Sequence, residues 1–181
     1  MKNSEKTGRK PGKAAGPGQP FWETKTLDQM SNAEWESLCD GCGRCCVEKF
    51  ENRKTGKVYF TNVACRYLDM QSCRCKAYQR RRKSAPWCLS LTPELIPKIR
   101  WLPRTCAYRR IFLNKALKWW HPLLSGSPES VHQAGISVRG RVISSRYVHP
   151  DDLENYIVDW EFWGQVGSGL RVNPLGKGNG A

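Results

Sequence analysis

CDGCGRCC, residues 39–46, places four cysteines within eight positions. Its first three cysteines are separated by two residues each, which is the spacing of a tight knuckle whose sulfurs can reach one metal ion. Gly41 and Gly43 fit such a loop because glycine adopts positive φ without strain. A domain that closes on a metal ion gains folding free energy from the binding. This segment therefore predicts a small metal-stabilised fold.

The fourth cysteine of the segment, Cys46, directly follows Cys45. Since neighbouring side chains usually diverge, we expect Cys46 to face a second centre or a bridging position. A tetrahedral site uses four ligands, and eight of the nine cysteines fall between residues 39 and 88. More than one metal ion per chain is therefore expected. The candidate metal ligands are Cys39, Cys42, Cys45, Cys46, Cys65, Cys73, Cys75, Cys88 and Cys106.

The spacing of the cysteines leaves the identity of the metal open. Thiolate ligands suit zinc and iron–sulfur clusters alike. The bacterial ferredoxin run continues its three cysteines with x3-Cys-Pro, whereas here Cys46 follows at once and Val47 comes next. A single buried cysteine is often only a small apolar side chain. For Cys106, within an expected helix, that reading weighs as much as metal ligation.

No secretory signal is visible in this 181-residue chain, because residues 1–20 lack an apolar stretch. Its apolar clusters are too short to span a bilayer. A cytoplasmic location is expected, where thiols stay reduced and clustered cysteines bind metal or perform redox chemistry. We predict a disordered basic tail over residues 1–20, a metal-binding domain over 21–163 and a flexible Gly-rich tail over 164–181.

Short elements separated by breakers predict an irregular α+β domain with the cysteine cluster at its centre. Ser31 and Glu34 form a capping box for a helix over residues 31–38, and a Thr-Gly turn marks a β-hairpin over residues 47–63. The remaining expectations follow from apolar spacing. They are helices over residues 76–83, 92–99, 104–120 and 149–163, and a strand or second hairpin over 136–148.

The formal net charge is +14, and between residues 74 and 118 thirteen Lys or Arg accompany a single acid, Glu94. Such a basic region could attract nucleic acid. Tyr78 and Trp87 flank its RRRK run and could stack on bases. A solvated helix face, with Arg81 packed against the cysteine cluster, explains the same residues and is favoured.

Catalytic motifs are not evident: the sequence has no phosphate-binding glycine loop and no nucleophile elbow. His121 and His149 each precede a proline, and His132 lies on a short polar segment, so a role in catalysis or metal binding is the weaker interpretation for all three. Asp151 and Asp152 stand where a helix is expected to start, and capping explains them.

Long stretches of the chain resemble the YcgN-type cysteine-cluster proteins, a bacterial family within the broader YkgJ-like group. The matching text includes FWETKTLDQMSNAEWESLCDGCGRCC, VYFTNVACRYLD, CRCKAYQRR, WLPRTCAYR, WHPLLSGS and ISVRG, between about residues 21 and 160. The group shares a CxxCxxCC motif and is described as zinc- or iron-chelating. Its shared skeleton implies seven ligands, Cys39, Cys42, Cys45, Cys46, Cys65, Cys75 and Cys88, whereas Cys73 and Cys106 match only the narrower family.

Three functions follow from these observations. The first is a cytoplasmic metal-binding protein that chelates zinc or iron through the cysteine cluster. The second is a redox protein or enzyme built on an iron–sulfur cluster. The third is a nucleic-acid-binding protein, with a structural zinc ion, that uses the basic region 74–118. The first is favoured, and the sequence indicates no substrate.

Overall fold

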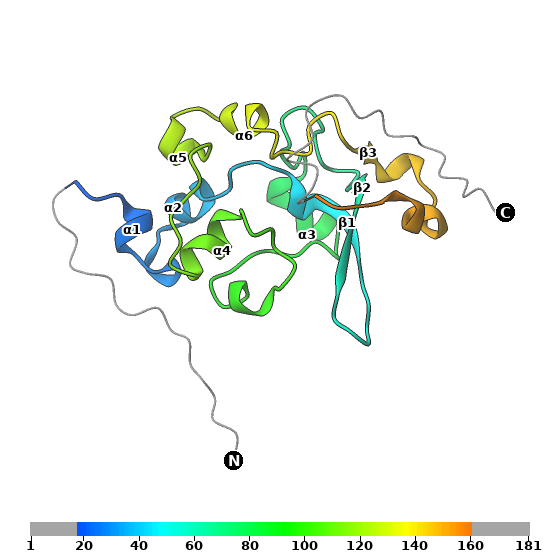
Figure 1. Ribbon diagram of the computed structural model, residues 1–181, viewed down its shortest axis with the longest axis horizontal. Helices are drawn as coiled ribbons and strands as arrows, with labels where there is room; N and C mark the ends of the chain where they lie inside the picture. Colours follow the sequence, from blue (N-terminus) through cyan, green and yellow to red (C-terminus); the bar gives the residue numbers. More distant parts are fainter. Residues whose placement is uncertain (1–17, 161–181) are drawn as a thin grey trace, which may run out of the picture. The chain divides into compact units, whose positions relative to one another are not determined.

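The computed structural model of the protein describes residues 18–160. The predicted tails therefore lie outside it, apart from residues 18–20. Over the described residues the chain forms two compact units. Unit 1 contains residues 18–40 and 82–131, and unit 2 contains residues 41–81 and 132–160. The predicted α+β class is confirmed, since short helices occur together with one mixed sheet (Figure 1).

The α-helices and strands are all short, and several 3-10 helices (η) join them. The α-helices are α1 (Phe21–Thr24), α2 (Asn32–Ser37), α3 (Arg81–Ser84), α4 (Ala107–Phe112), α5 (Pro122–Ser125) and α6 (Ser130–Gln133). The strands are β1 (Val47–Glu51), β2 (Val58–Ala64), β3 (Ile143–Ser144) and β4 (Ile157–Val158). The 3-10 helices are η1 (Leu27–Gln29), η2 (Arg44–Cys46), η3 (Tyr78–Arg80), η4 (Ile96–Lys98), η5 (Ser145–Tyr147) and η6 (Pro150–Tyr156).

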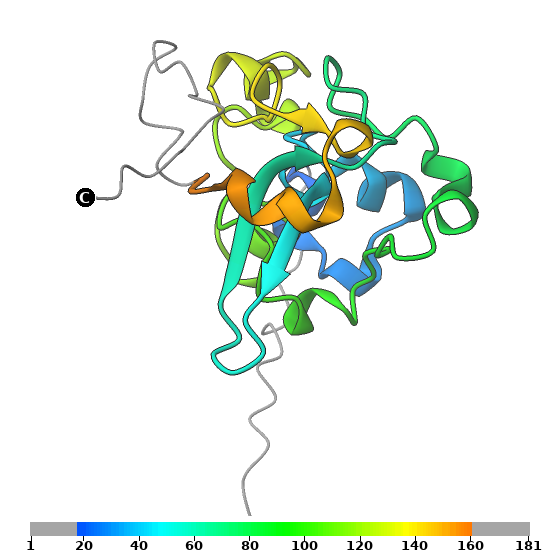
Figure 2. The same ribbon diagram turned by 90° about the vertical axis from the view of Figure 1, so that its right-hand side faces the viewer.

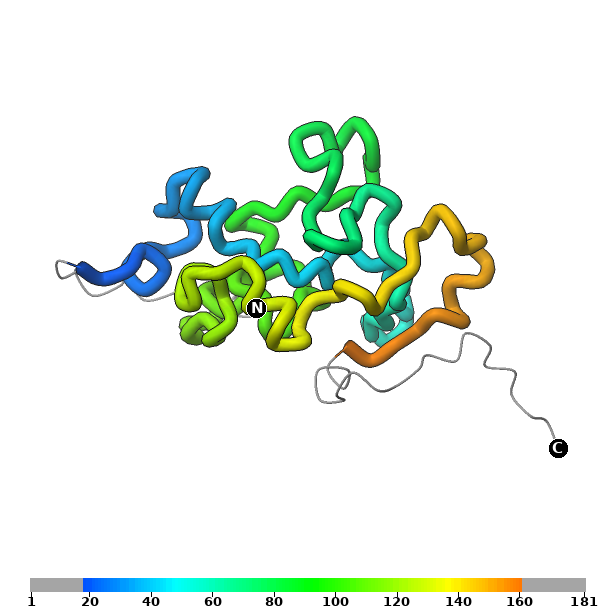
Figure 3. The backbone as a smooth tube through the Cα atoms, turned by 90° about the horizontal axis from the view of Figure 1, so that it is seen from above, coloured from blue at the N-terminus to red at the C-terminus, as the bar shows by residue number. Residues whose placement is uncertain are grey.

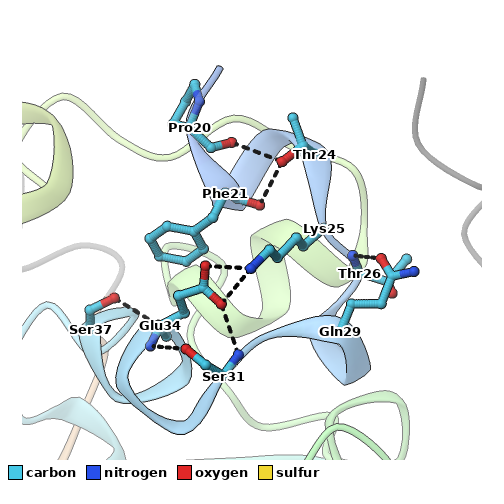
Figure 4. Close-up of polar contacts among 9 residues, drawn as sticks. All are labelled: Pro20, Phe21, Thr24, Lys25, Thr26, Gln29, Ser31, Glu34 and Ser37. Atoms are coloured by element: carbon cyan, nitrogen blue, oxygen red, sulfur yellow. Dashed lines mark hydrogen bonds and ion pairs between the residues drawn. The ribbon is translucent and has the colours of Figure 1, made fainter. Parts of the chain in front are cut away.

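Helix α2 of unit 1 begins with the predicted capping box. Ser31 Oγ accepts a hydrogen bond from the Glu34 amide at 3.3 Å, and Glu34 Oε2 accepts one from the Ser31 amide at 2.8 Å. Lys25, in the segment that precedes η1, donates to both carboxylate oxygens of Glu34, at 2.6 and 2.9 Å (Figure 4). The bond from Lys25 is the main cause that lowers the pKa of Glu34 below its ordinary value. One carboxylate therefore ties the chain before η1 to the start of α2.

Helix α4 packs against η1 and η4 and carries much of the core of unit 1. Its Tyr108 is buried, and the phenol donates to the Trp35 carbonyl oxygen at 3.0 Å while the two rings lie 4.6 Å apart. The helix is shorter than the predicted span 104–120. It ends because Asn114 adopts φ +53°, and the Lys115 amide then donates to the Arg110 carbonyl oxygen. This left-handed residue with its closing hydrogen bond is a common helix terminus.

The sheet of unit 2 is organised around β2. Strand β1 pairs with β2 antiparallel as the predicted hairpin, and β3 pairs with β2 in parallel. Strand β4 is antiparallel to β2. Figure 2 shows the hairpin in cyan with η6 and β4, in orange, alongside it. In Figure 3 the segment that carries η5 and η6 is a loop that turns back before β4.

Two sequence expectations for unit 2 are confirmed only in part. The region 136–148 contributes only the two residues of β3. The predicted final helix is a 3-10 helix over Pro150–Tyr156, and Ile157 and Val158 leave it to pair with Thr61 and Phe60 of β2. Backbone pairing to an existing strand therefore overrides the local helical pattern.

The core of unit 2 lies next to the cysteine loop. Its buried members come from β1, the end of β2 and three loops, and Cys46 packs against them from the side. They are Val47, Ala64, Leu68, Cys73, Val138 and Trp160. The end of the cysteine loop at Cys46 therefore packs against the hydrophobic core of unit 2.

Candidate metal centre

Both glycines of the cysteine loop adopt the left-handed conformation that the sequence predicts. Gly41 has φ +78° and Gly43 has φ +73°. Gly43 precedes η2, and its carbonyl oxygen accepts a hydrogen bond from the Cys46 amide at 2.9 Å. Non-glycine residues adopt this conformation at a cost. The two glycines therefore let the chain turn twice between Cys39 and Cys45.

Cys45 and Cys46 lie together. Their Sγ atoms are 3.8 Å apart, although the residues are neighbours in sequence. Two sulfurs bound at about 2.3 Å to a tetrahedral zinc ion are separated by about 3.8 Å. The expectation that these two side chains diverge is therefore wrong. Cys46 is the last residue of η2 and the chain enters β1 at Val47, so the backbone changes conformation between the pair and the strand.

Cys65 follows β2 and lies beside this pair. Its amide donates to the Cys46 carbonyl oxygen at 2.8 Å, which continues the pairing of Val47 with Ala64 by one step. The hydrogen bond fixes the backbone of Cys65 relative to that of Cys46. The order of β1 and β2 thus brings together two cysteines that are 19 positions apart in the sequence.

The amino group of Lys49, on β1, lies against the backbone next to Cys45 and Cys46. Its Nζ donates to the carbonyl oxygens of Val47 at 2.8 Å and of Cys45 at 3.2 Å. Burial lowers the pKa of Lys49, and negative charge on Cys45 and Cys46, with smaller effects from Glu48 and Cys65, acts in the opposite direction. The ammonium group therefore lies against the backbone of Cys45, where negative charge on the neighbouring cysteines favours its charged form.

The remaining cysteines of unit 2 are held by its core and loops. Cys42 is buried, and its carbonyl oxygen accepts from the Val138 amide at 2.9 Å. Cys75 forms an isolated antiparallel bridge with Leu68. Cys73 is buried with φ +54°. Burial raises the pKa of its thiol, opposed by the positive charge of Arg139, the Ser137 hydroxyl group and backbone N–H groups.

Unit 1 holds the other three candidate ligands, all half-buried. Cys39 follows α2, and its amide donates to the Glu36 carbonyl oxygen at 3.3 Å. The Cys88 amide donates to the Ala85 carbonyl oxygen at 2.8 Å. Cys106 is the N-cap residue of α4, so it begins the helix instead of lying within it.

Among residues 18–160, no three His, Cys, Asp or Glu side chains are grouped closely enough to hold a metal ion. No disulfide joins the nine cysteines, all of which fall within these residues. The arrangement brings Cys45 and Cys46 together and places the backbone of Cys65 beside them. Metal ligation by the full predicted set of nine stays a prediction.

The three histidines have structural partners. His121 is buried: its Nδ1 accepts from the Leu123 amide at 3.1 Å, and its Nε2 lies 3.1 Å from the Leu38 carbonyl oxygen. His149 caps η6 in the same way through the Asp151 amide. The Nδ1 atom of His132 lies 2.7 Å from Ser137 Oγ. Sequence reasoning noted the His-Pro pairs but did not predict that both histidines cap helices that begin with proline.

The basic region 74–118 contains one cation–π pair that bears on nucleic-acid binding. The Arg81 guanidinium lies 4.0 Å from the centre of the Tyr78 ring, and it donates to the Tyr78 carbonyl oxygen at 2.7 Å. Arg81 is therefore paired with Tyr78, and its expected packing against the cysteine cluster stays a prediction. Trp87 is 66% exposed. Nucleic-acid binding through this region stays a prediction.

Comparisons with known proteins agree with the cysteine pattern. A family model described as "CxxCxxCC: Putative zinc- or iron-chelating domain" matches residues 38–107. A UPF0260 protein of Allorhizobium ampelinum is 54% identical over 142 residues, which cover 78% of this chain and 89% of that protein. The chain belongs to the UPF0260 family. The relationship confirms the resemblance to bacterial cysteine-cluster proteins.

Other UPF0260 proteins match over the same share of this chain. One from Granulibacter bethesdensis is 58% identical over 141 residues and is covered to 84% of its length, and one from Sinorhizobium fredii is 52% identical and is covered to 91%. No solved structure matches the chain. Within residues 18–160, no helix combines the length and the apolar character that crossing a bilayer requires.

Lys49 is the residue near the cysteines that sequence reasoning missed. It lies three positions beyond Cys46, between two glutamates of β1, and this local pattern gives no distinct signal. Its side chain reaches back to the Cys45 carbonyl oxygen, next to a shift in the register of the hairpin between Val47 and Lys49. Such an irregularity has no reliable sequence signal.

Proposed function

We propose that this UPF0260 protein binds zinc or iron through its cysteines, with Cys45 and Cys46 as paired ligands of one ion. The 3.8 Å separation of their sulfurs carries the proposal. That distance is the edge of a tetrahedral zinc–thiolate site, so the two sulfurs already have the separation that such a site requires. Cys65 is the nearest further candidate ligand, because its amide is bonded to the Cys46 carbonyl oxygen.

The surroundings of the pair favour bound thiolates. Thiols ligate metal only after losing a proton, and the ammonium group of Lys49 interacts favourably with the anions that result. A bound ion would fix the end of η2 to the end of β2 and supply folding free energy to short elements. Thiolate centres need reduced cysteines, which supports the cytoplasmic location expected from the sequence.

The ligand atoms do not distinguish zinc from iron, because thiolates bind both metals. The test is elemental analysis of protein purified under anaerobic, reducing conditions without a metal-affinity tag. We expect at least one equivalent of zinc or iron per chain. Visible absorption separates the two, since zinc–thiolate centres are colourless and iron–sulfur clusters are brown. Less than about a tenth of an equivalent of every transition metal, relative to one four-ligand site per chain, would falsify the proposal.

Cys46→Ser tests the ligand assignment. The variant should lose the ion that the pair holds, because one of its thiolates is gone. Thr61→Val serves as the control: Thr61 is fully buried in the same unit, so its replacement perturbs the fold without removing a sulfur. A Cys46→Ser protein with the full metal content of the parent would remove Cys46 from the ligand set.

A further inference from the structure

The amino group of Lys49 is directed at the cysteines, in contrast to the other lysines of the hairpin. Lys54 and Lys57 are exposed, whereas Lys49 is half-buried with Nζ bonded to two backbone carbonyl oxygens. Placing an ammonium group in a partly buried site costs free energy unless anions or acceptors compensate it. The two carbonyl groups satisfy two of its three N–H donors, but they carry no net charge of their own.

The hydrogen bond from Lys49 Nζ to the Cys45 carbonyl oxygen, at 3.2 Å, places the ammonium group beside a proposed metal ligand. The sulfur of Cys46 lies 3.8 Å from that of Cys45, and the backbone of Cys65 is bonded to that of Cys46, so three thiols belong to this region. When protonated, the three thiols are neutral and attract the ammonium group far less. Thiolates at these positions, the state that metal binding requires, attract the nearby ammonium group.

The positive charge of Lys49 would offset the negative net charge of a metal–thiolate centre. A divalent ion held by three thiolates has a net charge of −3 + 2 = −1, and with four thiolates the net charge is −2. One ammonium group brings the first to zero and the second to −1. An uncompensated charge in a partly buried site is unfavourable, and an adjacent opposite charge reduces that cost.

We propose that Lys49 is the counter-cation of the metal–thiolate centre at Cys45 and Cys46, and that its charge sets the affinity of the centre for a divalent ion. The proposal rests on the proposed metal-binding function. Lys49 is a positioning residue in this role, since its Nζ contacts carbonyl oxygens and acts on the ion through the sulfurs. The geometry of the two Nζ hydrogen bonds holds the charge in place.

Three substitutions separate charge from structure. Lys49→Arg keeps the charge, Lys49→Gln keeps an N–H donor without the charge, and Lys49→Met keeps the length of the side chain with neither. Lys54→Met is the matched control, because it removes one positive charge from an exposed position of the same hairpin. The affinity of each protein for zinc is measured by competition with a chromogenic chelator.

We expect Lys49→Gln and Lys49→Met to bind zinc about 10- to 100-fold more weakly than the parent, the usual range for residues that support metal ligands. Lys49→Arg and Lys54→Met should stay within about threefold of the parent, because the charge near the sulfurs is preserved in both. Unchanged affinity in Lys49→Gln and Lys49→Met overturns the proposal, and so does a loss in Lys49→Arg as large as theirs.

A purely structural role is tested by unfolding each variant with and without zinc. The proposal requires that Lys49→Gln lose more unfolding free energy in the presence of zinc than in its absence. An equal loss in both states, including outright unfolding of the metal-free variant, overturns it. The parent protein separates the two levels of inference: a parent that binds no metal refutes the proposed function, whereas a parent and a Lys49→Gln variant that bind zinc equally refute only the role of Lys49.

Discussion

A Cβ atom placed on Gly43 would lie 2.7 Å from Cγ2 of Val138, well inside van der Waals contact. Val138 also donates its amide to the Cys42 carbonyl oxygen at 2.9 Å, and Arg44 Nε donates to the Ile136 carbonyl oxygen at 2.7 Å. The segment around Val138 therefore packs on the cysteine loop and bonds to it on both sides of Gly43. The loop is shaped by a part of the chain that lies about ninety positions away in the sequence.

Gly43→Ala should destabilise the protein by about 2–4 kcal/mol, the sum of overpacking and left-handed strain. The added methyl group has no room beside Val138, and alanine disfavours φ +73°. The measurement is the free energy of unfolding in urea. The change should also lower metal content, because the loop that carries Cys45 and Cys46 must shift.

Gly56→Ala is the control for backbone strain. Gly56 has φ +65° in the hairpin turn, and a methyl group added there would meet no neighbouring atom within 4 Å. Alanine at this position should cost only about 1 kcal/mol, from the left-handed conformation alone. If Gly43→Ala cost no more than Gly56→Ala, the contact with Val138 would not restrict the loop.

Thr61→Val should destabilise the protein by about 1–3 kcal/mol, the cost of leaving buried polar groups unsatisfied. Thr61 is fully buried on β2; its Oγ1 donates to the Glu48 carbonyl oxygen at 2.9 Å and accepts from the Val63 amide at 3.1 Å. Valine fills the same space without either bond. Thermal unfolding of the two proteins measures the difference.

Thr105→Val, in contrast to Thr61→Val, should not destabilise the protein. Within the described part of the chain, the buried Oγ1 of Thr105 has no hydrogen-bond partner. Replacing this hydroxyl group by a methyl group should leave stability unchanged or raise it by up to about 1 kcal/mol. A loss as large as that of Thr61→Val would show that the hydroxyl group of Thr105 has a partner in solution.

Asp69 should contribute to the acid sensitivity of unit 2. The amides of Ser72 and Gln71 donate to its carboxylate at 2.9 and 3.0 Å, and Lys76 Nζ lies 3.3 Å away. These interactions, led by the bond from Ser72, lower the pKa of Asp69 to about 2. Because the folded-state pKa is below the unfolded value of about 3.9, this stabilisation is present above about pH 4 and is lost as the pH falls toward 2.

Asp69→Asn and Lys76→Met test this assignment in unfolding experiments at several pH values. The stability difference between the parent and Asp69→Asn should be constant from pH 7 to about pH 5 and should shrink between pH 4 and 2. Lys76→Met should retain most of the pH dependence, because the two backbone bonds come first among the causes. A difference that stays constant down to pH 2 would rule out this role for Asp69.

Local signals predicted part of this structure correctly. The capping box at Ser31 and Glu34, the hairpin that contains β1 and β2, and the left-handed glycines of the cysteine loop all depend on residues close in sequence. Such features follow from side-chain hydrogen bonding and backbone conformation, which adjacent residues determine. Membership of a bacterial cysteine-cluster family was also predictable, because the CxxCxxCC motif lies within eight adjacent residues.

Features that depend on distant residues were missed. The helix expected over 149–163 gives way to β4, because Ile157 and Val158 pair with β2. The separation of the Cys45 and Cys46 sulfurs depends on the junction of η2 with β1, which spacing alone does not describe. Lys49 Nζ bonds back to the Cys45 carbonyl oxygen beside a shift in strand register. Each of these outcomes is decided by tertiary contacts that override a local pattern.

The last prediction concerns the number of metal ions. Nine cysteines exceed the four ligands of one tetrahedral site, so we expect about two equivalents of metal per chain of the parent. The paired sulfurs of Cys45 and Cys46 belong to one of them. Cys45→Ser and Cys46→Ser should therefore each lose the same single equivalent, and the double variant should lose no more than either one. Native mass spectrometry, supported by elemental analysis, measures these counts. A double variant that loses two equivalents would mean that the cysteines bind different ions, and one equivalent in the parent would leave a single site.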